Sequence, residues 1–137
     1  MGLDIGDSRI GVALSDPGGI LASPLMIIDR RDDETDVAAI AAVVSRYEVG
    51  QIIAGLPRSM DGSTGRQAEK VAAFTARISG HIAVPVAFRD ERLTTVSAQR
   101  LMRAARGKKK QKRVRDDAVA AALILQGYLD ENQQLKP

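Results

Sequence analysis

The fold is decided by residues 1–28, which read MGLDIGDSRIGVALSDPGGILASPLMII. This stretch holds three apolar runs, at residues 1–5, 9–14 and 20–28. Glycines and polar residues that favour tight turns separate the runs, first at 6–8 and then at 16–19. We therefore expect three strands that are joined by hairpins and pair as an antiparallel meander.

Helices and strands alternate in the rest of the chain. At residues 33–47, for example, Val37, Ile40 and Val44 recur at helical spacing. The full set of expected elements is a helix at 33–47, a strand at 51–55, a helix at 65–79 that stops at Gly80, a strand at 84–88, and helices at 94–106 and 116–130. The sequence therefore predicts an α/β fold with a mixed five-stranded sheet, in which three antiparallel strands are followed by parallel strands, flanked by helices.

Composition limits both the size of the protein and its chemistry. A length of 137 residues suits one domain, residues 1–137, and 45% hydrophobic with 27% charged residues is a globular balance. No apolar run is long enough to cross a membrane and no signal sequence is recognisable, so we expect a cytoplasmic protein. The chain has no cysteine and one histidine, His81, which we expect in an exposed loop. Its chemistry must use carboxylates, hydroxyls and basic groups.

Three acidic residues each lie at the edge of an apolar segment. Asp4 is in the first run, Glu91 follows 84–88, and Asp117 precedes the apolar residues 118–122. In the predicted sheet, strands one, four and five can be neighbours, which would bring Asp4 and Glu91 together. Asp117, in the first turn of the final helix, can approach these two acids if that helix packs across the same end of the sheet. Taken singly, each acid is more often a surface charge, and Asp116 or Asp117 could cap the helix.

A cluster of three carboxylates suits divalent metal ions. Hydrolysis of a phosphodiester needs an activated water and a stabilised leaving oxygen, and two ions about 3.5–4 Å apart serve both needs. Mg²⁺ prefers carboxylate and water oxygens, and Mn²⁺ uses the same kind of ligand. Without metal, three clustered acids would repel one another. The trio therefore indicates a metal-dependent nuclease that uses Mg²⁺ or Mn²⁺.

The basic residues are concentrated in one stretch. Residues 103–115, RAARGKKKQKRVR, hold eight of the 20 Lys and Arg residues and no acid. Like charges in a block repel each other, so we expect a mobile basic loop at about 104–115 that contacts the phosphate backbone of nucleic acid, although a solvated loop is the alternative. No aromatic residue lies in it, which argues against base stacking. The candidate contacts are Lys108, Lys109, Lys110, Lys112 and Arg113.

Several motifs together resemble the YqgF/RuvX family. They are GLDIGDSRIGVA at 2–13, GLP at 55–57 with DGSTG at 61–65, DERLTT at 90–95, and Asp117 ahead of ILQ at 124–126. The resemblance implies a ribonuclease H-like fold and metal-dependent nuclease activity. It also implies a role in maturing the 5′ end of 16S rRNA, and kinship with Holliday junction resolvases. By motif match, the catalytic and metal-binding acids fall on Asp4, Glu91 and Asp117.

Three arginines outside the basic stretch are further candidates for contacts with nucleic acid. Arg9 could bind a phosphate or cover the sheet with its stem, and Arg58 follows a strand that ends at the expected active edge. Arg92 could orient Glu91, neutralise phosphate charge, or pair with Asp90. Family members usually carry residues ahead of the first strand, so either the start is truncated or the first strand is short, and a longer native N-terminus is one hypothesis.

The functional prediction has defined alternatives. The leading one is an endonuclease that processes pre-16S rRNA, and the others are a resolvase of branched DNA or a protein that binds nucleic acid without cutting it. An actin-like phosphotransferase also opens with an Asp-Ile-Gly strand, but its duplicated domain is far longer than this chain. A four-way junction would favour a homodimer with two sites.

Overall fold

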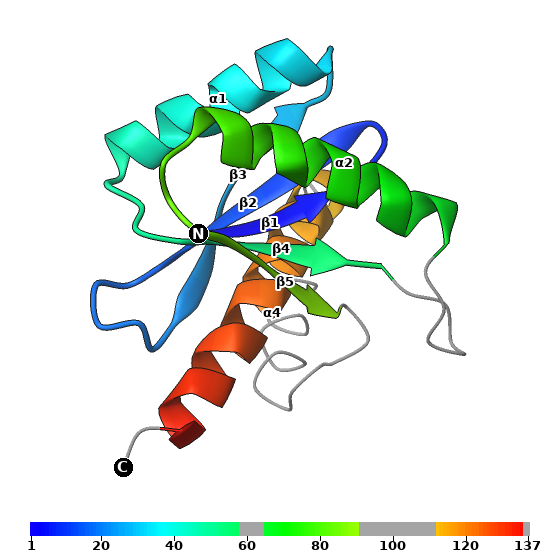
Figure 1. Ribbon diagram of the computed structural model, residues 1–137. Helices are drawn as coiled ribbons and strands as arrows, with labels where there is room; N and C mark the ends of the chain where they lie inside the picture. The colour runs from blue at the N-terminus through cyan, green and yellow to red at the C-terminus, as the bar shows by residue number, and fades with distance from the viewer. Residues whose placement is uncertain (58–64, 91–111, 136–137) are drawn as a thin grey trace.

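Five strands form one mixed sheet in the computed structural model, which describes residues 1–57, 65–90 and 112–135 (Figure 1). The strand order is β3-β2-β1-β4-β5. The strands are β1 (Gly2–Ile5), β2 (Arg9–Ser15), β3 (Ala22–Asp29), β4 (Ile52–Leu56) and β5 (Val86–Asp90). β1, β2 and β3 pair antiparallel, whereas β4 lies parallel to both β1 and β5. The predicted architecture is therefore confirmed, including the central place of β1.

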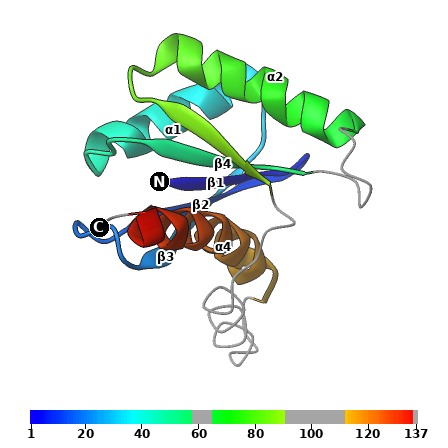
Figure 2. The ribbon, with the colours of Figure 1, turned by 60° about the horizontal axis from the view of Figure 1, so that its bottom comes forward.

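Helices cover both faces of the sheet (Figure 2). α1 (Asp33–Arg46) and α2 (Arg66–His81) lie on one face, and α4 (Lys112–Leu135) lies on the other. The first face buries a core cluster that includes Leu3, Ile10, Ile40, Ile52 and Ile78. The second face buries a smaller cluster that includes Ala13, Ala22, Ile53, Ala121 and Leu125. Burial of both faces explains why the central strands are almost wholly apolar.

Two strands are displaced from their expected positions. β5 begins at Val86 rather than at residue 84, because Pro85 has no N–H to give to the ladder, although its carbonyl still accepts a bond of 2.9 Å from Ile52 N. The strand then continues through the polar residues Arg89 and Asp90. β3 begins at Ala22 rather than at residue 20, because Ile20 and the residue after it belong to the preceding turn.

The helix ends also differ from expectation. α1 starts as predicted, capped by Asp32, whose side chain accepts from Thr35 N at 2.8 Å. α2 passes through Gly80 and ends at His81, since a glycine costs a helix only about 1 kcal/mol relative to alanine. His81 is exposed as expected, but on a helix end rather than in a loop.

α4 is longer than predicted at both ends. It begins at Lys112, so the last four residues of the expected basic loop, 112–115, are helical. Lys and Arg are good helix formers, and their intrinsic propensity outweighs the charge repulsion used to predict a loop. The predicted helix at 94–106 lies outside the described residues. No helix in the described part of the chain has the length and apolarity needed to span a membrane.

Candidate active edge

Three strands end together at one edge of the sheet, which we name the candidate active edge. β1 ends at Ile5, β4 at Leu56 and β5 at Asp90. The three strands are mutually parallel, so their carboxyl ends point the same way. Ligands of open α/β sheets bind at such ends, where side chains from separate strands can meet.

Asp4 lies one residue before this edge and is partly buried. Its neighbours Leu3 and Ile5 are buried in the cluster beneath α1 and α2. Because side chains alternate along a strand, Asp4 faces the other side of the sheet, which α4 covers. Gly2 shares that face, since a Cβ built on it would lie 2.6 Å from the carbonyl oxygen of Ala121.

β5 leads directly to the second expected acid. Phe88 is in register with Ala54, which is in register with Leu3, so these residues form one row across the sheet. β5 continues two residues past that row and ends at Asp90, the residue before Glu91. Glu91 itself lies outside the described residues.

α4 runs in the opposite direction to β1. Near the start of β1, the Tyr128 hydroxyl bonds the Gln51 side chain at 3.2 Å, and the Met1 amino group bonds the Gln51 carbonyl at 2.9 Å. One residue along β1, Gly2 meets Ala121 and Leu125. Lower numbers in α4 thus correspond to positions nearer the candidate active edge.

The direction of α4 shows which turn of the helix carries Asp117, the third expected acid. Asp117 precedes Ala121 by four residues, which is about one turn and about 6 Å. It is the sixth residue of α4, and Asp116 is the fifth, so the expectation that one of them caps the helix is wrong. The side chain of Asp117 lies outside the described part of the structure.

The described residues include few of the expected contacts with nucleic acid. Arg9 begins β2, beside the carboxyl end of β1, and is partly buried opposite Asp29. Lys112 and Arg113 lie in the first turn of α4, but their side chains are not described. The other candidates lie outside the described residues: Arg58, Arg92, Lys108, Lys109 and Lys110.

The relationship of the chain to known proteins agrees with this arrangement. A family model described as "RuvX: Holliday junction resolvase" matches residues 1–131. The chain belongs to the RuvX family. A curated relative from Moorella thermoacetica is 50% identical over 130 residues, which are 95% of this chain and 93% of the relative. Another, from Desulforamulus reducens, is 47% identical over 133 residues, 95% of each chain. Both are named "Putative pre-16S rRNA nuclease".

Solved structures show the fold of this RuvX member. RuvC from Thermus thermophilus superposes with a TM-score of 0.58 at 15% identity, covering 97% of this chain and 95% of that chain. The same protein in complex with a Holliday junction substrate gives a TM-score of 0.59 at 14% identity, covering 96% and 94%. At these identities the likeness concerns the fold alone. The expected ribonuclease H-like fold is confirmed.

A cluster of charged residues around Arg30, beside the turn that follows β1, was not predicted from the sequence. Arg30 follows β3, and its guanidinium bonds Asp36, Asp33 and the carbonyl oxygen of Gly6 at 2.9, 2.9 and 3.1 Å. A cavity of about 340 Å³ beside it is lined by both acids and bases, including Asp7 and Lys70. The run Arg30-Arg31-Asp32-Asp33, placed between a strand and a helix, was the signal that could have revealed the cluster.

A buried arginine ties α4 to β5 in this RuvX fold. The Arg89 guanidinium lies 2.9 Å from the Glu131 carboxylate, and the Arg89 side chain is only 6% exposed. A Cβ on Gly127 would come within 2.4 Å of Arg89 Cζ, so a glycine on the helix lets the guanidinium lie against it. The contact joins the strand that leads to Glu91 with the helix that carries Asp117.

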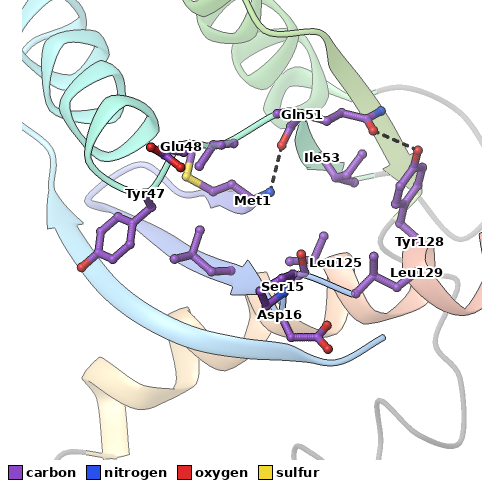
Figure 3. Close-up of a pocket in the computed structure, with 14 residues that line it drawn as sticks. Met1, Ser15, Asp16, Tyr47, Glu48, Gln51, Ile53, Leu125, Tyr128 and Leu129 are labelled. Carbon is purple, nitrogen blue, oxygen red and sulfur yellow. Dashed lines mark hydrogen bonds between the residues drawn. The ribbon is translucent and has the colours of Figure 1, made fainter. Parts of the chain in front are cut away.

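A cavity larger than the one beside Arg30 lies at the opposite end of the sheet, beside the start of β1 (Figure 3). It has a volume of about 670 Å³, and Met1, Tyr47, Tyr128 and Asp16 are among its lining residues. Burial lowers the pKa of the Met1 amino group to about 6, because the charged form loses water. Asp4 is not among the lining residues of this cavity, which therefore does not form part of the candidate active edge.

Two exposed carboxyl groups elsewhere have lowered pKa values because backbone N–H groups stabilise their charged forms. The pKa of Asp16 is lowered by bonds from Leu21 N and Ile20 N, at 3.0 and 2.7 Å, which fix the turn before β3. The pKa of Asp32 is lowered by the N–H and then the hydroxyl of Thr35, at the cap of α1. The hydrogen bonds that lower these two pKa values hold a turn and a helix cap, and neither carboxyl group lies at the candidate active edge.

Proposed function

We propose that this protein is a metal-dependent endonuclease whose catalytic acids are Asp4, Glu91 and Asp117, and that it processes the 5′ end of pre-16S rRNA. One observation carries the proposal. Asp4 faces α4 at the edge of the sheet where β5 leads into Glu91 and where α4 brings its N-terminal turns. Three elements that are distant in the sequence thus converge on the same end of one sheet face.

Helical spacing supports Asp117 rather than Asp116 as the third acid. Positions 117, 121 and 125 recur every four residues and therefore lie along one stripe of a helix. Ala121 and Leu125 on that stripe contact Gly2 on the Asp4 face of β1. Gly2 and Asp4 are two residues apart, about 6.6 Å along a strand, close to the 6 Å rise between positions 121 and 117.

The residues fit a hard divalent cation. Asp4 is a partly buried carboxylate on a central strand, and Glu91 and Asp117 would add two more oxygen ligands. Oxygen-only ligands of this kind suit Mg²⁺ or Mn²⁺. When bound, such ions would lower the pKa of a water and stabilise the leaving oxygen of the phosphodiester. The chain's own part is to fix Asp4 on a strand with two neighbours and to exclude water from the face beneath it.

The more similar relatives favour one substrate over the other. Those 50% and 47% identical to this chain carry a name that refers to pre-16S rRNA. The RuvC structure that contains a Holliday junction is only 14% identical. Processing of pre-16S rRNA is therefore the leading function. Resolution of branched DNA is the second candidate, favoured by the description of the RuvX family, and it would require a homodimer to cut two strands. For either substrate, the location that we propose is the cytoplasm.

The decisive experiment compares Asp4→Asn with the parent protein on a pre-16S rRNA fragment and on a synthetic four-way junction. Each substrate is tested with Mg²⁺ and with Mn²⁺. We expect Asp4→Asn to lower cleavage of the true substrate at least about 100-fold, because one carboxylate ligand of the ions is lost. Glu48→Gln, an equally conservative change of an exposed acid at the far end of the sheet, is the matched control and should cut at the parent rate.

The outcomes separate the alternatives. Cleavage of the RNA alone assigns rRNA processing, and cleavage of the junction alone assigns resolution. Equal rates for Asp4→Asn and the parent would rule out the proposed metal site. Tight binding of either substrate by the parent with no cleavage under both metals would show a binding protein instead of a nuclease.

A further inference from the structure

Arg30 uses all three guanidinium nitrogens to join separate parts of the fold. Its Nε donates to Asp36 Oδ2 at 2.9 Å and its Nη2 donates to Asp33 Oδ1 at 2.9 Å, both on α1. Its Nη1 donates to the carbonyl oxygen of Gly6 at 3.1 Å, in the turn that joins β1 to β2. The arginine thus links α1 to a turn that begins two residues after Asp4.

The α1 end of this link is rigid. Asp36 is only 2% exposed, and its second oxygen accepts from Arg31 N at 3.1 Å, so both carboxylate oxygens are held. The Arg30 guanidinium also lies over the Phe74 ring, 4.4 Å from its centroid, and the whole Arg30 side chain is 18% exposed. A buried carboxylate on one side and an aromatic face below leave the guanidinium little freedom.

Arg30 holds the turn end of the link through two hydrogen bonds. Besides the guanidinium contact to Gly6, the backbone N–H of Arg30 donates to the Ser8 carbonyl at 2.9 Å. Within the turn, Gly6 N donates to Arg9 O at 2.8 Å, and a Cβ on Gly6 would lie only 2.9 Å from that oxygen. The turn is tight and directly follows β1, so a shift in the turn would also move the last residues of β1.

We propose that Arg30 is a positioning residue for the candidate active edge, which holds the Gly6–Arg9 turn so that Asp4 keeps its place at the end of β1. The inference rests on the proposed function of Asp4. A lysine cannot replace the arginine, because its single nitrogen cannot reach Asp36, Asp33 and Gly6 together from one position. The strand end beneath the metal ligand would then be free to fluctuate, and small displacements of a ligand are costly for catalysis.

The test compares Arg30→Lys with Asp33→Asn. The first change loosens the link to the turn. The second removes the charge of the 44% exposed Asp33, which also weakens its 3.6 Å ion pair with Arg77, and leaves the bonds from Arg30 to Asp36 and Gly6 in place. Two readouts are taken where both variants are folded: kcat and KM for the cleaved substrate, and hydrogen exchange of the Gly6 and Arg30 backbone amides.

We expect Arg30→Lys to lower kcat by about 10- to 100-fold with KM changed less than about twofold. Exchange at the two amides should be about tenfold faster, as expected when a hydrogen bond that resists local opening is lost. Asp33→Asn should resemble the parent in both readouts. The proposal is overturned if Asp33→Asn loses as much kcat as Arg30→Lys, or if the turn loosens without any loss of kcat.

A second variant covers the possibility that Arg30→Lys does not fold. Asp36→Asn keeps the arginine and the shape of its anchor but removes one accepting oxygen, so a smaller fall in kcat with faster Gly6 exchange is expected; an unchanged kcat would refute the proposal. Failure of the proposed function looks different, because the parent protein would then cut neither substrate. Hydrogen exchange at Gly6 would still show whether Arg30 holds the turn.

Discussion

Glu48 shows how a single residue departs from what its sequence neighbours suggest. It follows the C-cap of α1 and has φ of 53°, the only positive value at a non-glycine residue in the described part of the chain. Glycine usually occupies this position of a helix end, and here Gly50 comes two residues too late to serve. The helix end therefore carries local backbone strain that its sequence did not reveal.

Replacing Glu48 by glycine should stabilise the protein. A left-handed conformation costs a residue with a Cβ roughly 1 kcal/mol, and glycine avoids most of that cost. We expect Glu48→Gly to raise the free energy of unfolding by about 0.5–1 kcal/mol, or Tm by about 3 °C, measured by thermal melts. Glu48→Ala loses the same carboxylate but keeps a Cβ, so it should show no gain. An equal rise for both variants would locate the effect in the charge.

Asp4 and Arg30 differ in how clearly their sequence neighbourhoods indicate a role. The place of Asp4 at the edge of an apolar segment led us to predict a functional acid, because buried structure holds such a carboxylate in place while leaving it at the surface, where a metal ion can reach it. Arg30 gave a weaker signal, the run Arg30-Arg31-Asp32-Asp33 between a strand and a helix, because Arg and Asp residues before a helix are common. Its role appears only from the contacts that join it to Gly6 and Asp36.

At the scale of elements, the packing of α4 on the sheet decides the candidate site. Gly2 allows the backbone of α4 to approach β1, because its absent side chain leaves room for Ala121 O and Leu125 Cβ. Gln126 holds α4 against the start of β3, because its side chain accepts from Ala22 N at 2.8 Å and donates to Ile20 O at 2.9 Å. The position of Asp117 relative to Asp4 depends on this close approach.

Gly2→Ala should displace α4 from the sheet. The new Cβ would lie 2.6 Å from a backbone oxygen, which cannot move unless the helix moves. We expect a loss of about 1–3 kcal/mol in the free energy of unfolding by denaturant titration, together with reduced cleavage. Gly80→Ala in α2 is the control, because no atom lies within 4 Å of its added Cβ, and it should be neutral or stabilising by up to about 1 kcal/mol. Parent-like stability of Gly2→Ala would show that α4 tolerates a shift.

The shifted ends of β5 and α4 show why boundaries were harder to predict than elements. Apolar periodicity identified both elements, but it says nothing about polar residues that continue a strand or a helix. Arg89 extends β5 because it is neutralised by Glu131 on a helix more than forty residues away. Such a contact is invisible to any local pattern.

At the scale of the whole molecule, charge is separated along the chain. The net charge is +3, yet residues 103–115 hold eight basic residues and no acid, so the remaining 12 basic and 17 acidic residues sum to −5. A protein with this pattern is attracted to phosphate mainly through one segment. The proposed clamp on nucleic acid by the stretch at about 104–115 follows from that separation.

The salt dependence of binding tests the clamp. If about four phosphates are neutralised, the slope of log K against log salt should be near −3.6 on duplex DNA, at about −0.9 for each phosphate. Replacing Lys108, Lys109 and Lys110 together by Gln should flatten the slope by up to about 2.7, as measured by fluorescence anisotropy. Arg46→Gln, at the end of α1, is the control. An unchanged slope in the triple variant would eliminate the clamp.

The sequence by itself determined the kinds and order of the elements and the mixed sheet, and it predicted Asp4 as a functional acid. These features follow from periodicity, turn residues and short motifs, which act within a few residues of one another. Tertiary structure alone decided that α4 runs against β1, that β5 continues as far as Asp90, and that Arg30 ties α1 to the turn after Asp4. Those relations depend on contacts between distant segments, such as Ala22 with Gln126 at a separation of 104 residues. Local patterns cannot specify them, because their energy exists only once the sheet and its helices have packed together.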